Sequence, residues 1–271
     1  MNAKILLIIT LFFLQKQLVF SQCTIIEKIQ DYKKTVKIKH SNLMFNDCID
    51  SSTFSIKTYM EMYPALKTIK RGYVFDYHYF DNFSYGRPYI YVRNKKFNLA
   101  KHVNNLADRR KLIGEERTEF MYRNIYDFLE YSLYRAKKNI FPEDTEEGYI
   151  QYLYFYEMGE LFALKWHAAY KEKQVICTEN MMKNIVEQYI EKQKNEIPDF
   201  EVDTIKLQNL LGINELINKE LNTDNCIIKW IEIEPFHGIY ERTYKIIRKE
   251  PYTIELINEK QLVEIRQNFI Y

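Results

Sequence analysis

The chain has few of the residues that make flexible linkers. Its 271 residues include only 7 glycines and 6 prolines, and it carries neither an internal repeat nor a low-complexity tract. A chain of this length without linkers is expected to fold as one compact unit.

Recognisable catalytic motifs are also missing. The sequence contains no GxSxG, HExxH, Walker-type or GxGxxG segment and no EF-hand loop. These absences argue against the enzyme classes that depend on such motifs. Glycosidases need only two well-placed carboxylates, which spacing in the sequence does not exclude. The sequence therefore leaves open whether the chain is an enzyme, and we expect no cofactor.

A net charge of one sign is absent too. The chain has 39 lysine and arginine residues against 37 aspartate and glutamate residues. Positive charge is densest over residues 93–117, where eight basic side chains meet three acidic ones. A chain without a strong overall field is not typical of dedicated nucleic-acid binders, so we expect no nucleic-acid partner.

Residues 1–21 have the layout of a secretory signal peptide. Lys4 precedes the apolar block Ile5–Leu14, which is shorter than a membrane-spanning helix requires. Val19 and Ser21 stand at the −3 and −1 positions of a cleavage site after Ser21. Cleavage there removes two lysines and no acid, so the remaining chain carries 37 charges of each sign. We expect a secreted or periplasmic protein with no transmembrane span after signal removal, folded as a single compact domain over residues 22–271.

A lipid anchor on Cys23 is the alternative to a soluble exported chain. Gln22 precedes that cysteine, where such anchors usually require a small residue.

Cysteine usage agrees with export, because all four cysteines follow the leader: Cys23, Cys48, Cys177 and Cys226. An even number of cysteines in an exported chain favours disulfides, and three pairings are possible. We expect Cys23–Cys48 and Cys177–Cys226, since each bond would tie a terminal layer to its neighbour. The chain has no CxxC segment, so the cysteines predict neither a zinc knuckle nor a thioredoxin-type site, and we expect no metal site.

Residues 71–93 predict an aromatic hairpin. Aromatic residues occupy every second position of RGYVFDYHYF, a turn-rich segment follows, and Tyr89–Arg93 returns as a partner strand. If Tyr79 faces Tyr89 and Tyr77 faces Tyr91, four tyrosines share one face. Such a face either binds sugar rings or peptide, or packs on the helices behind it.

The rest of the chain predicts helices followed by strands. The most apolar segment, Asp144–Lys173, is expected to be a buried central helix with Asp144 as its N-cap. Further helices are expected over 115–138 (antiparallel to the central helix) and 179–194. Residues 203–222 are expected to form one bent helix or two short ones, with the break at Gly212, and strands are expected over 227–234, 239–248 and 252–257. The predicted fold class is α+β, with a central bundle of about three to five helices (roughly 98–222) flanked by the N-terminal aromatic hairpin and a C-terminal antiparallel β-meander.

Candidate catalytic residues lie on one side of the predicted central helix. Glu157, Glu160 and His167 fall within a narrow sector of its helical wheel, with Lys171 beside them. They form either an acidic and histidine site tuned by the lysine, or a solvated stripe of ordinary surface residues.

Three functions are compatible with these observations. The first is a non-catalytic binding module of the cell envelope, which contacts a protein or glycan ligand through Tyr77, Tyr79, Tyr89 and Tyr91. The alternative is an envelope hydrolase that uses Glu157, Glu160 and His167. A third and less favoured alternative is an immunity-type protein that neutralises a secreted toxin.

Overall fold

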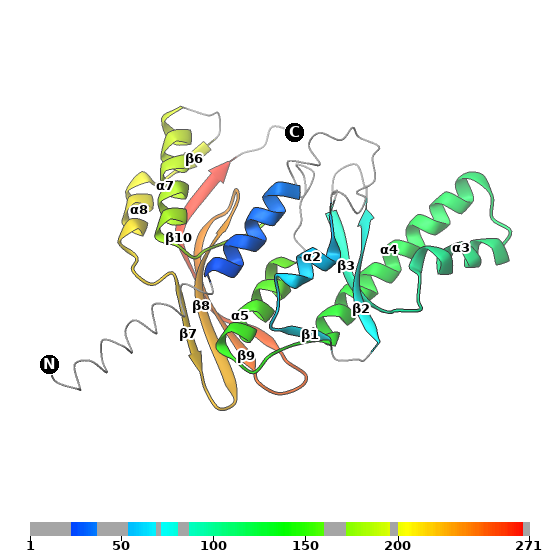
Figure 1. Ribbon diagram of the computed structural model, residues 1–271. Helices are drawn as coiled ribbons and strands as arrows, with labels where there is room; N and C mark the ends of the chain where they lie inside the picture. The colour runs from blue at the N-terminus through cyan, green and yellow to red at the C-terminus, as the bar shows by residue number, and fades with distance from the viewer. Residues whose placement is uncertain are drawn as a thin grey trace.

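The computed structural model describes residues 23–36, 54–68, 72–80, 87–159, 172–195 and 200–267. It confirms the α+β class, because an antiparallel six-stranded sheet and a separate hairpin are combined with helices. Figure 1 shows the sheet with α7 and α8 at one end, the first helix (residues 23–36) and α5 in the middle, and the hairpin with α3 and α4 on the far side. The helices are thus spread over both halves of the molecule.

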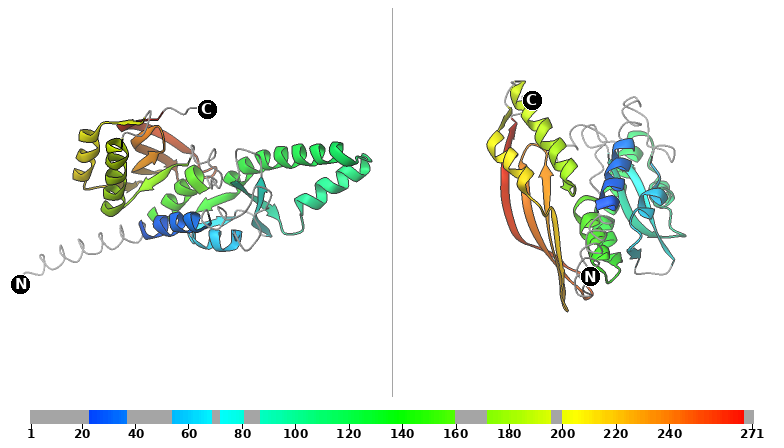
Figure 2. Two further views of the ribbon diagram at one scale, coloured as in Figure 1. Left: turned by 90° about the horizontal axis from the view of Figure 1, so that it is seen from above. Right: turned by 60° about the vertical axis from the view of Figure 1, so that its left-hand side comes forward.

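The six-stranded sheet is built mainly from the C-terminal meander. Its order is β5 (Gln174–Ile176), β8 (Asn225–Glu234), β9 (Gly238–Ile247), β10 (Ile254–Gln267) and β6 (Phe200–Val202), while β7 (Ile217–Leu221) also pairs with β8. The three predicted meander strands are confirmed, and β10 continues well beyond the predicted end at Ile257. The views in Figure 2 show how strongly this sheet twists.

The prediction of a bent helix over 203–222 is wrong in its second half. Helix α8 (Thr204–Asn209) and a 3-10 turn (Leu210–Gly212) occupy only the first part. Ile217–Leu221 pairs with β8, with Ile217 opposite Trp230. The backbone pairing of β7 with β8 and the burial of Ile217 outweigh the local helical pattern.

Side chains along β8 point alternately to the two faces of the sheet, and each face packs in a different hydrophobic core. Ile228 and Trp230 pack in one core with α5 (Glu146–Tyr154) and the first helix. Ile231 and Ile233 point to the opposite side and pack with α7 (Glu179–Lys194) and α8. We call the first side of the sheet the α5 face.

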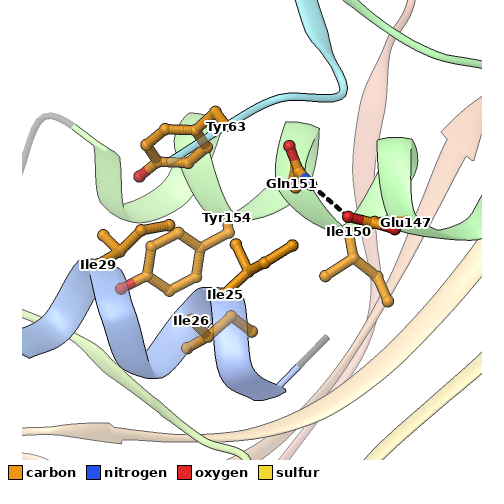
Figure 3. A pocket seen from close by; sticks show the side chains of 8 residues that line it. All are labelled: Ile25, Ile26, Ile29, Tyr63, Glu147, Ile150, Gln151 and Tyr154. Atoms are coloured by element: carbon orange, nitrogen blue, oxygen red, sulfur yellow. Dashed lines mark hydrogen bonds between the residues drawn. The ribbon is translucent and has the colours of Figure 1, made fainter. Parts of the chain in front are cut away.

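The first helix docks on α5 through apolar side chains. Figure 3 shows Ile25, Ile26 and Ile29 of the first helix facing Ile150 and Tyr154 of α5. The start of the described chain is thereby fixed against the central helix.

The central helix begins at Glu146, and its described part is helical as far as Gly159. Its N-cap is Thr145, whose side chain accepts a hydrogen bond from the Gly148 amide, so the prediction of Asp144 as the cap is off by one residue. After Tyr154 the backbone continues as a π-helical turn, Phe155–Gly159. Residues 160–171 lie outside the described part, and strand β5 begins at Gln174.

The aromatic hairpin is confirmed as β2 (Tyr73–Phe80) and β3 (Arg87–Asn94). Helix α4 (Gly114–Asn139) packs on β3 and on α3 (Leu99–Arg109), although the sequence placed it along the central helix. Two short strands, β1 (Leu66–Thr68) and β4 (Ile140–Pro142), pair beside α5, and β1 follows α2 (Ile56–Glu61).

Candidate functional site at the open end of the sheet

The predicted tyrosine face does not form, because the hairpin register differs by one residue from the prediction. Tyr77 lies opposite Ile90, and Tyr91 lies opposite Asp76. A shift of one residue moves a side chain to the other face of a strand. Tyr77 and Tyr91 therefore point to opposite sides of the hairpin.

Packing covers both of these tyrosines. The ring of Tyr77 lies 4.8 Å from that of Phe54, at the edge of the main core. Tyr91 is 4 % exposed and packs in the cluster formed with α3 and α4, where its ring contacts Phe128. The hairpin thus lies between two apolar clusters. The side chains of Tyr79 and Tyr89 lie outside the described part.

Of the predicted catalytic residues, the structure describes Glu157, in the π-helical turn. Its carboxylate lies 3.7 Å from the Lys173 ammonium. Turns of this kind occur frequently at functional sites. Glu160, His167 and Lys171 lie outside the described residues, so their convergence with Glu157 stays a prediction.

Lys173 links Glu157 to two carboxylates of the sheet. Its ammonium nitrogen lies 3.6 Å from Glu232 and 3.1 Å from Glu234, both on the α5 face of β8. Three carboxylates from segments far apart in the sequence therefore meet at one lysine.

Arg242 on β9 holds the same carboxylates from the other side. Its guanidinium pairs with Glu232, with Glu234 at 2.6 Å and with Glu259 of β10 at 2.6 Å. Glu232 is fully buried and also accepts a hydrogen bond of 2.8 Å from the Trp230 indole. Buried charges are tolerated when they are paired and hydrogen-bonded in this way. We call this group the Arg242 cluster: Glu157, Lys173, Glu232, Glu234, Arg242 and Glu259.

Beyond the Arg242 cluster the α5 face opens into a polar groove of about 600 Å³. A second depression of about 500 Å³ adjoins it and shares the side chains of Glu201, Glu264 and Arg266. Glu264 and Arg266 form a bidentate ion pair with N–O distances of 2.9 and 3.0 Å. Their side chains are 54 % and 64 % exposed. This end of the sheet is therefore accessible to a partner.

Tyr240 joins the cluster to the groove. The Arg242 guanidinium lies 4.7 Å from the centre of its ring, and Gln261 donates a 3.1 Å hydrogen bond to its hydroxyl. Burial raises the pKa of the Tyr240 phenol, and the negative charges of Glu234, Glu259 and Glu264 raise it further.

The combined surface, which we call the Tyr240 face, carries unbalanced negative charge. Its six carboxylates and three cations leave a formal charge of −3 in a chain whose overall formal charge is +2. Its members are Glu157, Lys173, Glu201, Glu232, Glu234, Tyr240, Arg242, Glu259, Gln261, Glu264 and Arg266.

The arrangement suits binding better than proton transfer. Each carboxylate of the Arg242 cluster has a cationic partner within 4 Å, so the cluster consists of fixed ion pairs. Across the described ranges, no three histidine, cysteine or acidic side chains are grouped as a metal site. In the same ranges, no helix has the length and apolar character needed to cross a membrane.

Sequence reasoning missed Glu232 and Glu234, although one signal was present. In the strand IIKWIEIE they follow Trp230 at every second position, so they share its inward-facing side. Charged residues at inward positions of an apolar strand indicate a buried ionic site. His237, in the turn between β8 and β9, also lines the groove.

The predicted disulfide between Cys177 and Cys226 is wrong. Cys23, Cys177 and Cys226 are buried free thiols, and Cys48 lies outside the described residues. Cys226 packs on the α5 face of β8, opposite Ile246, whereas Cys177 lies beside Cys23. The predicted pairing assumed that a Cys177–Cys226 bond ties a terminal layer to its neighbour, but the structure places Cys177 beside Cys23.

Comparison with known proteins finds no match to this chain among family models, curated proteins or solved structures.

Proposed function

We propose that the chain is an exported, non-catalytic binding protein whose contact surface is the Tyr240 face. Its partner is a protein that presents lysine or arginine side chains. The observation that carries the proposal is the formal charge of −2 on the exposed members of the face, Glu201, Glu259, Glu264 and Arg266, at an accessible end of the sheet. Complementary charge steers association and selects between partners.

The shape of the groove supports a macromolecular partner. Sites for small molecules are usually enclosed and mostly apolar. This groove is open, and carboxylates, amides and Arg266 line it together with Phe236, Tyr240 and Ile265. The fixed ion pairs of the Arg242 cluster hold several of the carboxylates in place before a partner arrives. Such preorganisation lowers the entropy lost on binding.

The direct test measures binding of a cationic peptide. Residues 22–271 are titrated by calorimetry with oligolysine, with oligoglutamate and with a neutral oligosaccharide, at low and high salt. We expect binding of oligolysine alone, weakening as salt rises because exposed charges are screened.

Matched variants locate the surface. The double variant Glu201→Gln/Glu264→Gln removes two carboxylates of the Tyr240 face, and Glu187→Gln/Glu191→Gln removes two exposed carboxylates of α7. We expect at least a tenfold loss of oligolysine affinity in the first variant and little change in the second. Equal losses in both, or binding of the oligosaccharide instead, would refute the proposal. Sedimentation of the protein alone shows whether the chain associates with a second copy of itself.

A hydrolase is the second candidate, and one observation favours it. The π-helical turn brings Glu157 to the Lys173 ammonium, beside Glu232 and Glu234. The test is turnover of fluorogenic glycoside and peptide substrates by the wild-type chain and by Glu157→Gln. Activity that Glu157→Gln abolishes would favour this candidate, and no turnover of any substrate counts against it.

A further inference from the structure

Two cysteines from distant parts of the chain lie in contact. Cys23 opens the first helix and Cys177 directly follows β5. The Cys23 sulfur lies 2.7 Å from the carbonyl oxygen of Cys177, and the Cys177 sulfur lies 3.7 Å from the carbonyl oxygen of Cys23. Each sulfur thus reaches across to the backbone of the other residue, and both side chains are buried.

Contacts along the helix hold the two backbones in this position. The Gln30 side-chain amide donates a 3.0 Å hydrogen bond to the Val175 carbonyl. The Thr178 hydroxyl donates a 3.3 Å hydrogen bond to the Glu27 carboxylate. The first helix is therefore aligned with β5 and with the start of α7, so the approach of the two sulfurs does not depend on a single contact.

We propose that Cys23 and Cys177 form a disulfide bond in the exported protein. The pairing replaces both pairings expected from the sequence, and leaves Cys226 as a buried thiol in the core of the α5 face. It rests on the export part of the proposed function, because disulfides persist in oxidising compartments.

The bond forms by exchange with a disulfide oxidant, such as glutathione disulfide or a disulfide-bearing oxidoreductase. The thiolate of one of these two cysteines attacks one sulfur of the oxidant, whose own disulfide breaks and releases one thiolate. The thiolate of the other cysteine then attacks the sulfur of the first cysteine and displaces the second thiolate. Two protein thiols are oxidised, the oxidant is reduced to two thiols, and the two protons end on those thiols. Because both cysteines are buried in the folded chain, exchange takes place before the first helix has docked.

Peptide mapping without reduction tests the pairing directly. Cleavage after lysine and arginine places the four cysteines in separate peptides, 22–28, 40–57, 174–183 and 220–229. Residues 22–271 are refolded in a buffer of oxidised and reduced glutathione, alkylated under denaturing conditions and digested. We expect 22–28 linked to 174–183, with a mass lower by two hydrogen atoms than the sum of the two peptides, and an alkylated 220–229.

Single variants and a binding measurement separate the possible outcomes. Cys226→Ser should retain the linked pair, and Cys177→Ser should lose it. A link between 22–28 and 40–57 in the wild-type chain, or four alkylated cysteines after refolding, overturns the proposal. Oligolysine binding is measured on the same samples. A missing disulfide with intact binding contradicts this inference alone, and a formed disulfide without binding contradicts the Tyr240 face alone.

Discussion

Glu232 and Arg242 form a buried ion pair where the apolar part of the α5 face ends. The Glu232 side chain is 0 % exposed and that of Arg242 is 8 % exposed. The Trp230 indole donates to the far oxygen of the same carboxylate. The pair therefore joins the hydrophobic core to the charged surface, and it fixes the guanidinium that holds Glu234 and Glu259.

Replacing Arg242 should strongly destabilise the fold. Arg242→Met keeps much of the apolar volume but leaves Glu232 buried with Lys173, 3.6 Å away, as its remaining cation. Removing one partner of a buried pair costs about 3–5 kcal/mol of unfolding free energy. Urea denaturation followed by tryptophan fluorescence measures the loss.

The matched control for Arg242 is Lys229 on the neighbouring strand. Lys229 pairs with Glu241 at 3.5 Å, but both side chains are partly exposed. Lys229→Met should change the unfolding free energy by less than about 1 kcal/mol, as is usual for exposed pairs. If Arg242→Met costs no more than Lys229→Met, Arg242 does not organise this end of the sheet.

Gly148 should not tolerate a methyl group, although it lies in a helix. A Cβ atom at this position would lie 2.1 Å from the Glu143 carbonyl oxygen. Alanine normally stabilises a helix relative to glycine. Here the clash reverses the sign, and we expect Gly148→Ala to lose about 1–3 kcal/mol, as in overpacked sites.

Gly212 supplies the control for Gly148. No heavy atom lies within 4 Å of a Cβ built there. Gly212→Ala should be neutral or should stabilise the chain by up to about 1 kcal/mol, because it restricts the unfolded chain. If the denaturant midpoints of the two variants move in the same direction, the close approach of Gly148 to the Glu143 carbonyl is wrong.

Stability should fall on the alkaline side because buried tyrosines resist ionisation. Burial raises the pKa of both Tyr152 and Tyr189 from 10.0 to about 12. Between these values the unfolded chain binds fewer protons than the folded chain, so unfolding becomes easier as the pH rises above the ordinary tyrosine pKa. Each residue contributes a loss on the order of 2 kcal/mol across this window.

Urea titrations between about pH 9 and pH 11, with tyrosinate absorbance, test this pH dependence. Tyr189→Phe removes one ionisable group and should flatten the decline. A decline as steep in Tyr189→Phe as in the wild-type chain would mean that this phenol ionises freely in the folded state.

Tyr91 should act as a core residue of the hairpin. Tyr91→Ala removes a buried ring from the cluster with α3 and α4 and should cost about 3–5 kcal/mol. Tyr91→Phe keeps the ring and loses only a long, 3.4 Å hydrogen bond to Asp76, so it should cost at most about 1 kcal/mol. Thermal unfolding of both variants gives the comparison. If Tyr91→Ala leaves the thermal stability unchanged, the Tyr91 ring does not contribute to this core.

Local signals predicted much of the fold. Helix α7 has the predicted bounds, because Thr178 caps its first turn and its apolar residues recur at helical spacing. The period-two aromatics of β2 and the turns of the meander also gave the right elements. Hairpin register was wrong by one residue, since the sequence does not show how the intervening turn aligns the two strands.

The candidate site could not be predicted, because no local pattern brings its parts together. Glu157 lies on a π-helical turn, Lys173 precedes β5, and Glu232, Arg242 and Glu259 lie on three successive strands. Their proximity depends on the order of strands in the sheet and on the docking of the central helix. For the same reason the sequence did not predict the contact between Cys23 and Cys177, which are 154 residues apart.

Hydrogen exchange in the presence of oligolysine tests most directly whether the Tyr240 face is the contact surface. Backbone amides of residues 238–242 and 259–267 should exchange more slowly with the peptide than without it, while those of β2, β3 and α3 are unchanged. Slower exchange confined to the hairpin strands, with no change around Tyr240, would contradict the account.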